Sequence, residues 1–436
     1  MLKKGALILT LLLTNSCTDH QSFQNEYDLV ISNVNVVNVE NGTITSNANI
    51  AIFDSKIIKI TTKLIDTRRS TQSIDAGGAY ATPGYTNAHV HSFSTPHDSA
   101  INSDKDYLDF YNKNIIPQFN KFVEQGFTTI VDPGGFLPYA TDTRDQIEQG
   151  NLIAPRIYTV GKVIDLENGH FSEFFCQGRE WCKQHLFIEI NETTDIKSVI
   201  TQLYAQGVDA IKVTYDSSFR NGLNTYDKLN DEHVKKIIDV ASNIGLPVLS
   251  HTTHLKEYID ITSFGINGFF HGPTPVDGKF IYDGQDFLSQ VDPHLLPLVS
   301  CYFFLAPSLK HENEQEQHQI DLTKNYTPAI RQLINSGYPI IFGSDFFAGV
   351  VDRIPLEIEA MQALGFSHLE ILQSLTMNAQ HLPFINIKMG QIKQDYMADI
   401  LLFSNNPLNS LDDLFKPKLV IKSGEVLIRN IHIQSN

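Results

Sequence analysis

The sequence predicts an α/β protein: a (β/α)8 TIM barrel joined to a small β-sandwich domain that both chain ends build. Two observations carry this prediction. Between residues 83 and 375, short apolar runs alternate with amphipathic stretches, which is the rhythm of repeated strand–helix units. At both ends of the chain, apolar and polar residues instead alternate one by one, as they do on half-buried strands.

The composition supports a folded globular protein and excludes several other classes. Hydrophobic residues make up 42% of the 436 positions and charged residues 19%, so the chain is not of the disordered type. Lys and Arg number 33 against 49 Asp and Glu, and the resulting charge of −16 argues against binding to nucleic acid. Four cysteines are too few for a disulfide scaffold, which leaves sixteen histidines as the residues to explain.

The first residues read as a targeting segment. Two lysines, Lys3 and Lys4, precede an apolar run over 5–13, and Cys17 follows a small residue. The run is too short to span a bilayer. The pattern is similar to a bacterial lipoprotein signal, so we expect residues 1–16 to be removed and Cys17 to carry lipid. Ordinary secretion is the alternative. In both cases we expect an exported periplasmic or cell-envelope protein. If Cys17 carries lipid, that anchor is its only expected contact with the membrane.

The β-sandwich domain is expected from segments 27–82 and 376–436. Alternation is clear in 27–34 and in 57–60, and Asn41-Gly42 is a hairpin turn signal. Near the other end, 398–403 and 419–428 read as strands, the second with a tight turn. Because the middle of the chain has a different pattern, we expect these two segments to pair with each other.

The barrel is expected from eight short apolar runs within 83–375, with amphipathic helices such as Asp231–Ile244 and Tyr326–Ser336 between them. Eight strands over this length fit a closed barrel better than an open sheet. The expected strands are Tyr85–Val90, Phe127–Val131, Arg156–Val160, Ala210–Thr214, Pro247–Ser250, Gly268–Phe270, Val299–Leu305 and Ile340–Phe342.

Polar residues of an unusual kind stand at the carboxyl ends of these runs, where barrel enzymes keep their active sites. Residues two apart on a strand face the same way, so His89 and His91 both enter the barrel mouth. His251, His271 and Asp345 end the fifth, sixth and eighth runs. Imidazoles and a carboxylate are ligands that suit Zn²⁺ and similar divalent ions.

Lys212 lies inside the fourth run, between Ile211 and Val213. Alternation directs its ammonium group into the barrel, where an isolated charge is costly. Carbamylation by CO₂ would convert the amine into an anionic ligand that can bridge two metals. The alternative is a lysine that reaches the rim and pairs with Asp209 or Asp216.

The motifs as a set resemble the amidohydrolase superfamily, in particular its imidazolonepropionase-like and prolidase-like branch. The resemblance covers nearly the whole chain after the first residues. The segments that carry it are 74–91, 126–135, 155–161 with Gly169-His170, Ile211-Lys-Val213, Ser250-His251, Phe270-His-Gly272, Gly343-Ser-Asp345, Thr376–Ala379, 389–393 and 398–402.

The resemblance implies a binuclear metal hydrolase that cleaves an amide, dipeptide-like or cyclic amide bond of a small molecule. His89, His91 and Asp345 would hold one divalent ion, expected to be zinc, and His251 and His271 the other. Carbamylated Lys212 and a hydroxide would bridge them, and Asp345 would move the proton. We expect substrate contacts from His170, Tyr215, Thr253 and His254. Self-association into a homo-oligomer is left open.

Three other functions remain open. The same metal site could hydrolyse an ester, lactone or phosphotriester. A mononuclear deaminase on this fold usually has a Glu three residues after the fifth-strand histidine, where this chain has His254, and would give Lys212 no role. An inactive binding lipoprotein should have lost ligands, and none is missing here.

The segment 172–184 matches no motif of the family. Cys176 and Cys182 bracket five loop-like residues in it, and export would allow them to form a disulfide.

Overall fold

The structure is a computed structural model that describes residues 26–95, 99–217, 227–290, 298–300 and 313–429. The predicted signal segment 1–16 and the predicted lipid site at Cys17 lie outside these ranges and stay predictions. Within them, every helix is too short or too polar to cross a bilayer.

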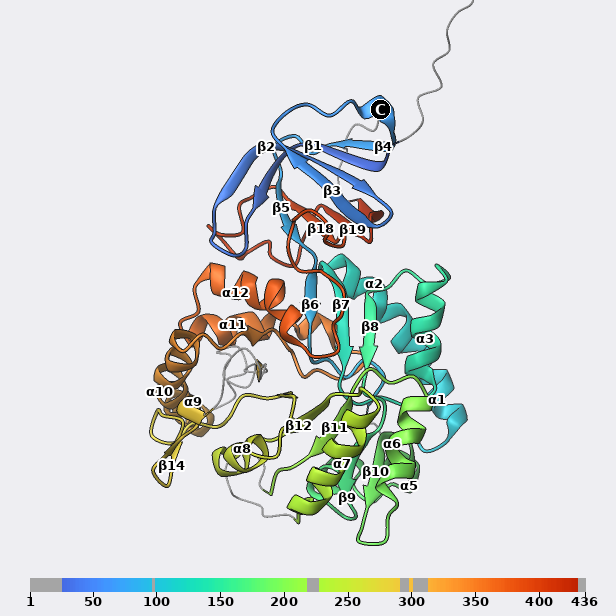
Figure 1. The fold of residues 1–436 in the computed structure, drawn as a ribbon, viewed down its shortest axis with the longest axis vertical. Coiled ribbons are helices and arrows are strands. Elements are labelled where there is room, and N and C mark those ends of the chain that lie inside the picture. Colours follow the sequence, from blue (N-terminus) through green and yellow to red (C-terminus); the bar gives the residue numbers. More distant parts are fainter. Residues whose placement is uncertain (1–25, 96–98, 218–226, 291–297, 301–312, 430–436) are drawn as a thin grey trace, which may run out of the picture.

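The two chain ends meet in one eight-stranded sheet, which forms the upper domain in Figure 1. β5 lies between a strand of the N-terminal segment and a strand of the C-terminal segment. It pairs parallel with β1 and antiparallel with β18. The strands are β1 (Tyr27–Val37), β2 (Ile44–Phe53), β3 (Lys56–Thr61), β4 (Ser70–Asp75), β5 (Tyr80–Pro83), β18 (Ile400–Phe403), β19 (Leu419–Lys422) and β20 (Glu425–Arg429).

This sheet is continuous in its hydrogen bonding, and it forms the small β domain that was expected as a sandwich. β1 changes neighbours along its length: its first half pairs with β4 and its second half with β5. Its register against β2 shifts near Asn33, which has a left-handed φ of 53°. Buried residues from seven of the strands, among them Ile31, Ile50 and Leu402, form a single apolar cluster. The sheet therefore bends around its own core.

The other domain contains the parallel strands. One sheet has β6 (Tyr85–Asn87), β7 (Phe127–Asp132) and β8 (Arg156–Thr159). The second sheet has the order β10-β9-β11-β12-β13-β16-β17. Its strands are β9 (Val163–Leu166), β10 (Phe187–Ile190), β11 (Ile211–Thr214), β12 (Val248–His251), β13 (Gly268–Phe269), β16 (Leu298–Val299) and β17 (Ile340–Ile341). Each of the eight expected runs thus carries a strand, although most are shorter, and residues 301–305 lie outside the described residues.

Backbone hydrogen bonds connect the two sheets on both sides. Beyond the end of β6, Ala88 N donates to Phe342 O beyond β17 over 2.8 Å. Asp209 N, just before β11, donates to Thr159 O at the end of β8 over 2.8 Å. The first and last strands of the domain are therefore neighbours.

Helices surround these strands in Figure 1. They are α1 (Asp104–Phe110), the π-helical turn Tyr111–Ile115, α2 (Ile116–Glu124), α3 (Tyr139–Glu148), α6 (Ile196–Ala205), α7 (Asp231–Asn243), α8 (Leu255–Thr262), α9 (Phe287–Gln290), α10 (Asn313–Asn335), α11 (Pro355–Ala363) and α12 (His368–Leu375). A short hairpin, β14 (Ile281–Tyr282) and β15 (Gln285–Asp286), lies between α8 and α9.

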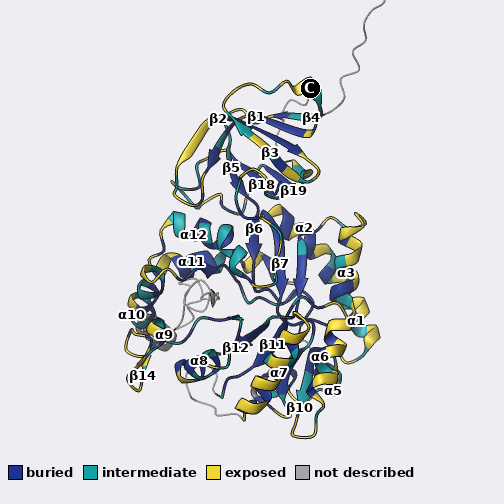
Figure 2. Ribbon diagram, viewed as in Figure 1, coloured by how far each residue is buried: buried dark blue, intermediate teal, exposed yellow. Residues whose placement is uncertain are grey.

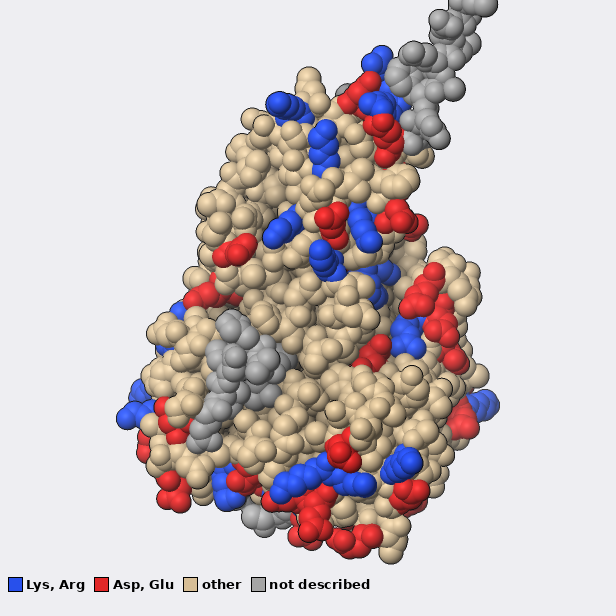
Figure 3. Space-filling model, in the orientation of Figure 1, with Lys and Arg blue, Asp and Glu red and all other residues tan. Residues whose placement is uncertain are grey.

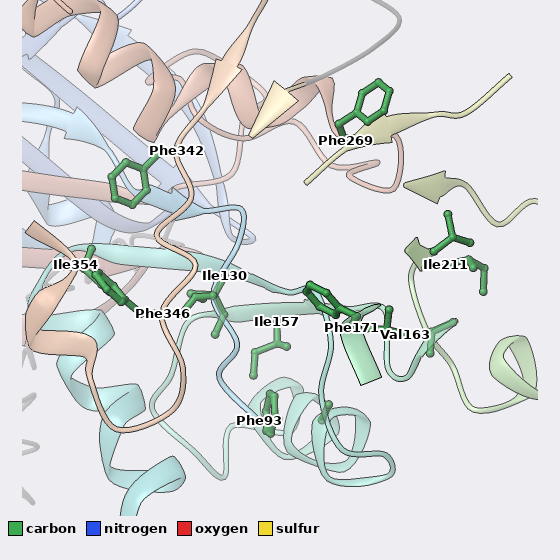
Figure 4. Close-up of a cluster of buried hydrophobic side chains, with 14 of the residues drawn as sticks. Phe93, Ile130, Ile157, Val163, Phe171, Ile211, Phe269, Phe342, Phe346 and Ile354 are labelled. Atoms are coloured by element: carbon green, nitrogen blue, oxygen red, sulfur yellow. The ribbon is translucent and has the colours of Figure 1, made fainter. Parts of the chain in front are cut away.

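Burial follows this arrangement: the strands are dark and the outer faces of the helices are exposed in Figure 2. The apolar layer between strands and helices takes one or two side chains from nearly every strand. Figure 4 shows part of it, with Phe93, Ile130, Ile157, Val163, Ile211, Phe269 and Phe342. A separate inner cluster includes Val131, Leu249, Phe270 and Ile341. Apolar burial on both sides of the strands is what a sheet wrapped by helices requires.

The surface carries charges of both signs. Lys and Arg are interspersed with Asp and Glu on the face drawn in Figure 3.

The segment 163–190 was the main error of the sequence analysis. The loop expected over 172–184 contains two helices, α4 (His170–Cys176) and α5 (Glu180–Leu186), and the strands β9 and β10 flank them. Both strands have only four residues and carry an acidic residue, Asp165 and Glu189, which interrupts the apolar pattern. A disulfide joins the two helices through Cys176 and Cys182, whose Cα atoms are 5.5 Å apart.

Asp165 fixes the start of α4. Its buried carboxylate accepts hydrogen bonds from the backbone N–H groups of Phe171 and Ser172, at 3.1 and 2.9 Å. Burial raises the pKa of Asp165 to about 7, even though these hydrogen bonds favour the charged form. The folded protein therefore holds this proton more tightly than the unfolded chain.

A raised pKa makes the contribution of Asp165 to stability fall as the pH rises from its unfolded value of 3.8 to about 7. Asp165→Asn keeps an oxygen acceptor but has no charge to bury. The free energy of unfolding of the wild type should therefore fall more between pH 5 and pH 8 than that of the variant, by on the order of 2 kcal/mol. Urea unfolding at both pH values measures this, with Asp195→Asn, an exposed capping residue of α6, as the control. Equal pH dependence in Asp165→Asn and wild type would contradict the assignment.

Candidate metal centre

Three potential metal ligands converge beyond the ends of β6 and β17. The Nε2 atoms of His89 and His91 are 3.2 Å apart. The Oδ1 atom of Asp345 lies 3.0 Å from the first of them and 3.4 Å from the second. His89, His91 and Asp345 form the group of His, Cys, Asp and Glu side chains that could hold a metal ion within the described residues.

Backbone carbonyl groups orient both imidazoles. Nδ1 of His89 lies 2.8 Å from the carbonyl oxygen of Phe270, and Nδ1 of His91 lies 3.2 Å from that of Gly134. A carbonyl oxygen can only accept, so each Nδ1 carries the proton and each Nε2 presents its lone pair. Histidines that bind metals are held in the same way in other proteins.

The geometry suits a divalent cation. Two lone pairs and a carboxylate oxygen face one another at 3.0–3.4 Å, an arrangement that is repulsive without a positive charge between them. Tetrahedral zinc with bonds of about 2.0–2.1 Å places its ligand atoms roughly 3.3 Å apart. The observed separations agree with that requirement.

The protonation states also suit a cation. Burial lowers the pKa of His89 to about 4, so its imidazole is neutral at neutral pH. A neutral imidazole and an ionised carboxylate are the forms that bind metals.

The backbone holds Asp345 in an uncommon conformation, with a left-handed φ of 55°. Its N–H and that of Ser344 both donate to the carbonyl oxygen of His89, over 2.8 and 3.0 Å. The side chain of Asn87 donates to Ser344 Oγ over 2.8 Å. These bonds connect residues 344 and 345, which follow β17, to residues 87 and 89, which end and follow β6.

A second pair of histidines lies next to this cluster. The ring of His271, after β13, is centred 4.8 Å from that of His89 and 4.5 Å from that of His251, at the end of β12. Both rings are buried. The predicted ligands of both metals therefore lie in one region.

Lys212 lies in the middle of β11 and is completely buried. Its Nζ is 5.1 Å from the ring centre of Phe270 and 5.3 Å from that of Phe171. Its neighbours Ile211 and Val213 belong to the apolar layer between strands and helices, so Lys212 faces the inner side of the strands, as alternation predicted.

Of the residues expected to contact substrate, Thr253 lies beside the histidines. Its N–H and hydroxyl both donate to Oδ2 of Asp216, at 2.8 and 2.6 Å, and the same oxygen is 3.8 Å from Nε2 of His251. Thr253 therefore orients a carboxylate beside His251. His254 begins α8 with its ring 5.8 Å from that of Tyr282, and His170 begins α4.

The expectation for Tyr215 was wrong. Its hydroxyl donates to Asp231 at the start of α7 over 2.7 Å, and its ring belongs to the apolar layer between strands and helices. The cause is alternation: Lys212 points inward, so the residue three positions later points outward.

The sequence analysis missed Asp132. This buried carboxylate ends β7, accepts from Phe93 N and Thr159 Oγ1 at 3.3 Å each, and interacts electrostatically with His91 and Lys212. Burial raises its pKa to about 6. The rule that singled out the other strand ends could have found it, since Asp132 directly follows the expected strand Phe127–Val131.

A sequence model described as the amidohydrolase family matches residues 80–427. An adenine deaminase from Dehalococcoides mccartyi is 42% identical over 77 residues. That match covers 18% of this chain and only 13% of the deaminase.

Solved structures share the fold over almost their whole length. An amidohydrolase has a TM-score of 0.74 at 20% identity, with 93% of this chain and 100% of that chain covered. A Xaa-Pro dipeptidase with methionine bound in its active site has 0.71 at 20% identity, covering 92% and 99%. Ochratoxinase from A. niger has 0.71 at 17% identity, covering 92% and 95%.

We predict that His89→Ala lowers the zinc content by at least one ion per chain, because it removes an imidazole whose Nε2 faces His91 and Asp345. Elemental analysis after dialysis against zinc gives the count. His368→Ala is the control, since this histidine begins α12 and its ring hydrogen-bonds to Leu408 O rather than to the cluster. Unchanged zinc in His89→Ala would show that the cluster does not bind the metal.

Proposed function

The chain belongs to the amidohydrolase family, and we propose that it is a hydrolase that uses two divalent metal ions to cleave the C–N bond of an amide, dipeptide-like or cyclic amide substrate. The observation that carries this proposal is the convergence of two imidazole lone pairs and an ionised carboxylate within 3.4 Å, beside a second pair of buried histidines.

The chain supplies ligands for both ions. His89, His91 and Asp345 would hold one, and His251 and His271 the other, with carbamylated Lys212 shared between them. Bound zinc ions would polarise the substrate carbonyl and make water nucleophilic at neutral pH. A carbamate would also replace a buried ammonium with an anion, which two cations favour.

Asp345 is suited to move the proton. Its side chain is 19% exposed, against 0% for His89 and 6% for His91, so it is the part of the cluster that substrate can reach. As a carboxylate it can accept a proton from the attacking water. It would then return that proton to the leaving nitrogen.

The proposed architecture is a closed (β/α)8 barrel. The hydrogen bonds of Ala88 and Asp209 across the two seams between the sheets support closure. Five of the six predicted ligands then lie at or beyond the carboxyl ends of their strands, where such barrels carry active sites, and Lys212 lies within β11.

Export to an oxidising compartment is part of the proposal. The disulfide between Cys176 and Cys182 supports it, because such bonds persist outside the reducing cytosol. Removal of residues 1–16 and lipid on Cys17 would place the protein at the cell envelope.

The local match to an adenine deaminase gives a second candidate reaction. A screen of the zinc-loaded protein against dipeptides, N-acyl amino acids, cyclic amides, lactones and adenine decides between them. Release of an amine or amino acid supports the proposal. Ammonia from adenine, or turnover of lactones alone, would overturn the assignment to amide bonds.

Lys212→Ala should lose one or both metal ions and most of its turnover, because the shared ligand is gone. Short carboxylates such as acetate or propanoate should restore part of both by entering the vacated space. Intact-mass analysis of the wild type under CO₂ should show the added carbamate. A Lys212→Ala protein with full zinc and normal turnover would exclude the shared-ligand role.

Asp345→Asn should keep an oxygen ligand but lose the proton acceptor. We expect turnover to fall by about 10²–10⁴-fold, the usual contribution of a general acid–base group, with a smaller change in KM. Steady-state kinetics on protein of verified zinc content tests this. Near-normal turnover with both metals present would assign the proton transfer to another group.

A further inference from the structure

We infer that a cavity between the β domain and the amino end of β8 binds a small organic molecule that carries one carboxylate and an apolar body. The inference is independent of the proposed function, because none of the proposed metal ligands lines this cavity. It gives a role to Lys422, which the metal chemistry does not use.

The cavity lies where the two domains of Figure 1 meet. One side is built by the end of α3, the residues that follow it and the start of β8, and the other by the β2–β3 turn and the β19–β20 hairpin. The cavity encloses about 310 Å³, which is enough for a small ligand, and ligand sites are frequent between domains. Arg156 in its wall begins β8, whereas His89 and His91 lie beyond the carboxyl end of β6. The cavity is therefore separate from the metal centre.

Two of the three cations that line the cavity are already paired with carboxylates. Arg144 donates to Asp209 Oδ2 over 3.1 Å. Arg156 donates to Asp399 Oδ2 and to Ser423 Oγ, over 3.1 Å each, and so joins the barrel strands to the β domain. The charges of both guanidinium groups are thus compensated within the protein.

Lys422 is the third cation, and it differs from the arginines in its partners. Its Nζ donates to the carbonyl oxygen of Ala154 over 2.7 Å, and it forms no ion pair with a carboxylate in the part of the chain that the structure describes. An ammonium group has three donors, so this bond leaves two of them for a ligand. Burial, and next the charge of Arg156, lower the pKa of Lys422 to about 8. A carboxylate in the cavity would supply the missing partner and favour the charged amine.

The other lining residues define the rest of the ligand. Glu148 and Glu425 are exposed, whereas Lys422 is partly buried, so the acidic groups lie on the solvent side of the ammonium. A second negative charge on the ligand would be repelled by them. Apolar side chains, among them Ile153 and Leu427, offer a surface on which an apolar body gains by leaving water. The cavity therefore suits a monocarboxylate rather than phosphate or a dicarboxylate.

The first test follows the reactivity of Lys422 in the full zinc-loaded chain, with 4-methylpentanoate as the probe. Limited acetylation followed by peptide mass spectrometry reports each lysine separately. At saturation, the probe should slow the acetylation of Lys422 at least threefold and leave that of Lys416, an exposed lysine of the same domain, unchanged. 4-Methyl-1-pentanol, which has the same apolar body without the charge, and inorganic phosphate should not protect Lys422.

The second test measures affinity by calorimetry. Because carboxylates can also bind at zinc, 4-methylpentanoate is titrated into both the wild type and His89→Ala, and we expect binding to persist in the variant. Lys422→Gln, which keeps a donor for Ala154, should reduce the affinity at least tenfold.

A pair of exposed isoleucines gives a matched control. Ile153→Asp adds a negative charge to the lining at a position that is 51% exposed, and it should weaken binding at least fivefold. Ile44→Asp should not, because Ile44 is also exposed but begins β2, at the other end of that strand from the turn that lines the cavity.

The outcomes separate this inference from the proposed function. Protection of Lys422 by 4-methylpentanoate, together with loss of affinity in Lys422→Gln, supports the inference even if no amide in the screen is cleaved. Equal acetylation with and without the probe, or binding that disappears in His89→Ala, would overturn it and leave the function standing. Equal protection by the alcohol or by phosphate would also overturn it, because neither carries a carboxylate.

Discussion

The imidazoles of His89 and His91 are positioned by two backbone carbonyl groups, those of Phe270 and Gly134. Each carbonyl fixes which nitrogen carries the proton and turns the other nitrogen toward Asp345. Gly134 can approach this closely because it has no side chain: a Cβ there would lie 2.9 Å from Val163 Cγ2 and 3.5 Å from His91 Cε1. The proposed metal chemistry depends on this contact, since rotating either ring would remove its lone pair from the cluster.

The proposed metal ligands and the inserted helices are held in place by different interactions. Ligands follow short buried strands, whose positions are fixed by parallel pairing and by apolar layers on both sides. The helices α4 and α5 lie outside the strand framework and depend on Asp165 and a disulfide for their placement. Loops and inserted helices can therefore vary without disturbing the metal ligands.

The sequence located most of the framework because two simple patterns dominate it. Apolar runs marked the eight strands, and the side-chain alternation on β11 correctly directed Lys212 inward. The same alternation, applied to Tyr215, would have avoided the error there. The helices α4 and α5 were not predictable from their composition, since their stability comes from Asp165, the cysteine pair and long-range packing. Asp132 was overlooked because an Asp before Pro and Gly also suits an ordinary turn.

The sheet that joins the two ends of the chain has a consequence for the order of folding. Pro83 in β5 pairs with Ile400 in β18, so the N-terminal strands cannot complete their hydrogen bonds until almost the whole polypeptide has been synthesised. During that time β5 lacks its partner and exposes an unpaired edge. Contacts of such long sequence separation form late, because the entropy of closing the loop must first be overcome. The β domain is therefore expected to close only after β18 has been synthesised, later than the barrel strands that precede it in the chain.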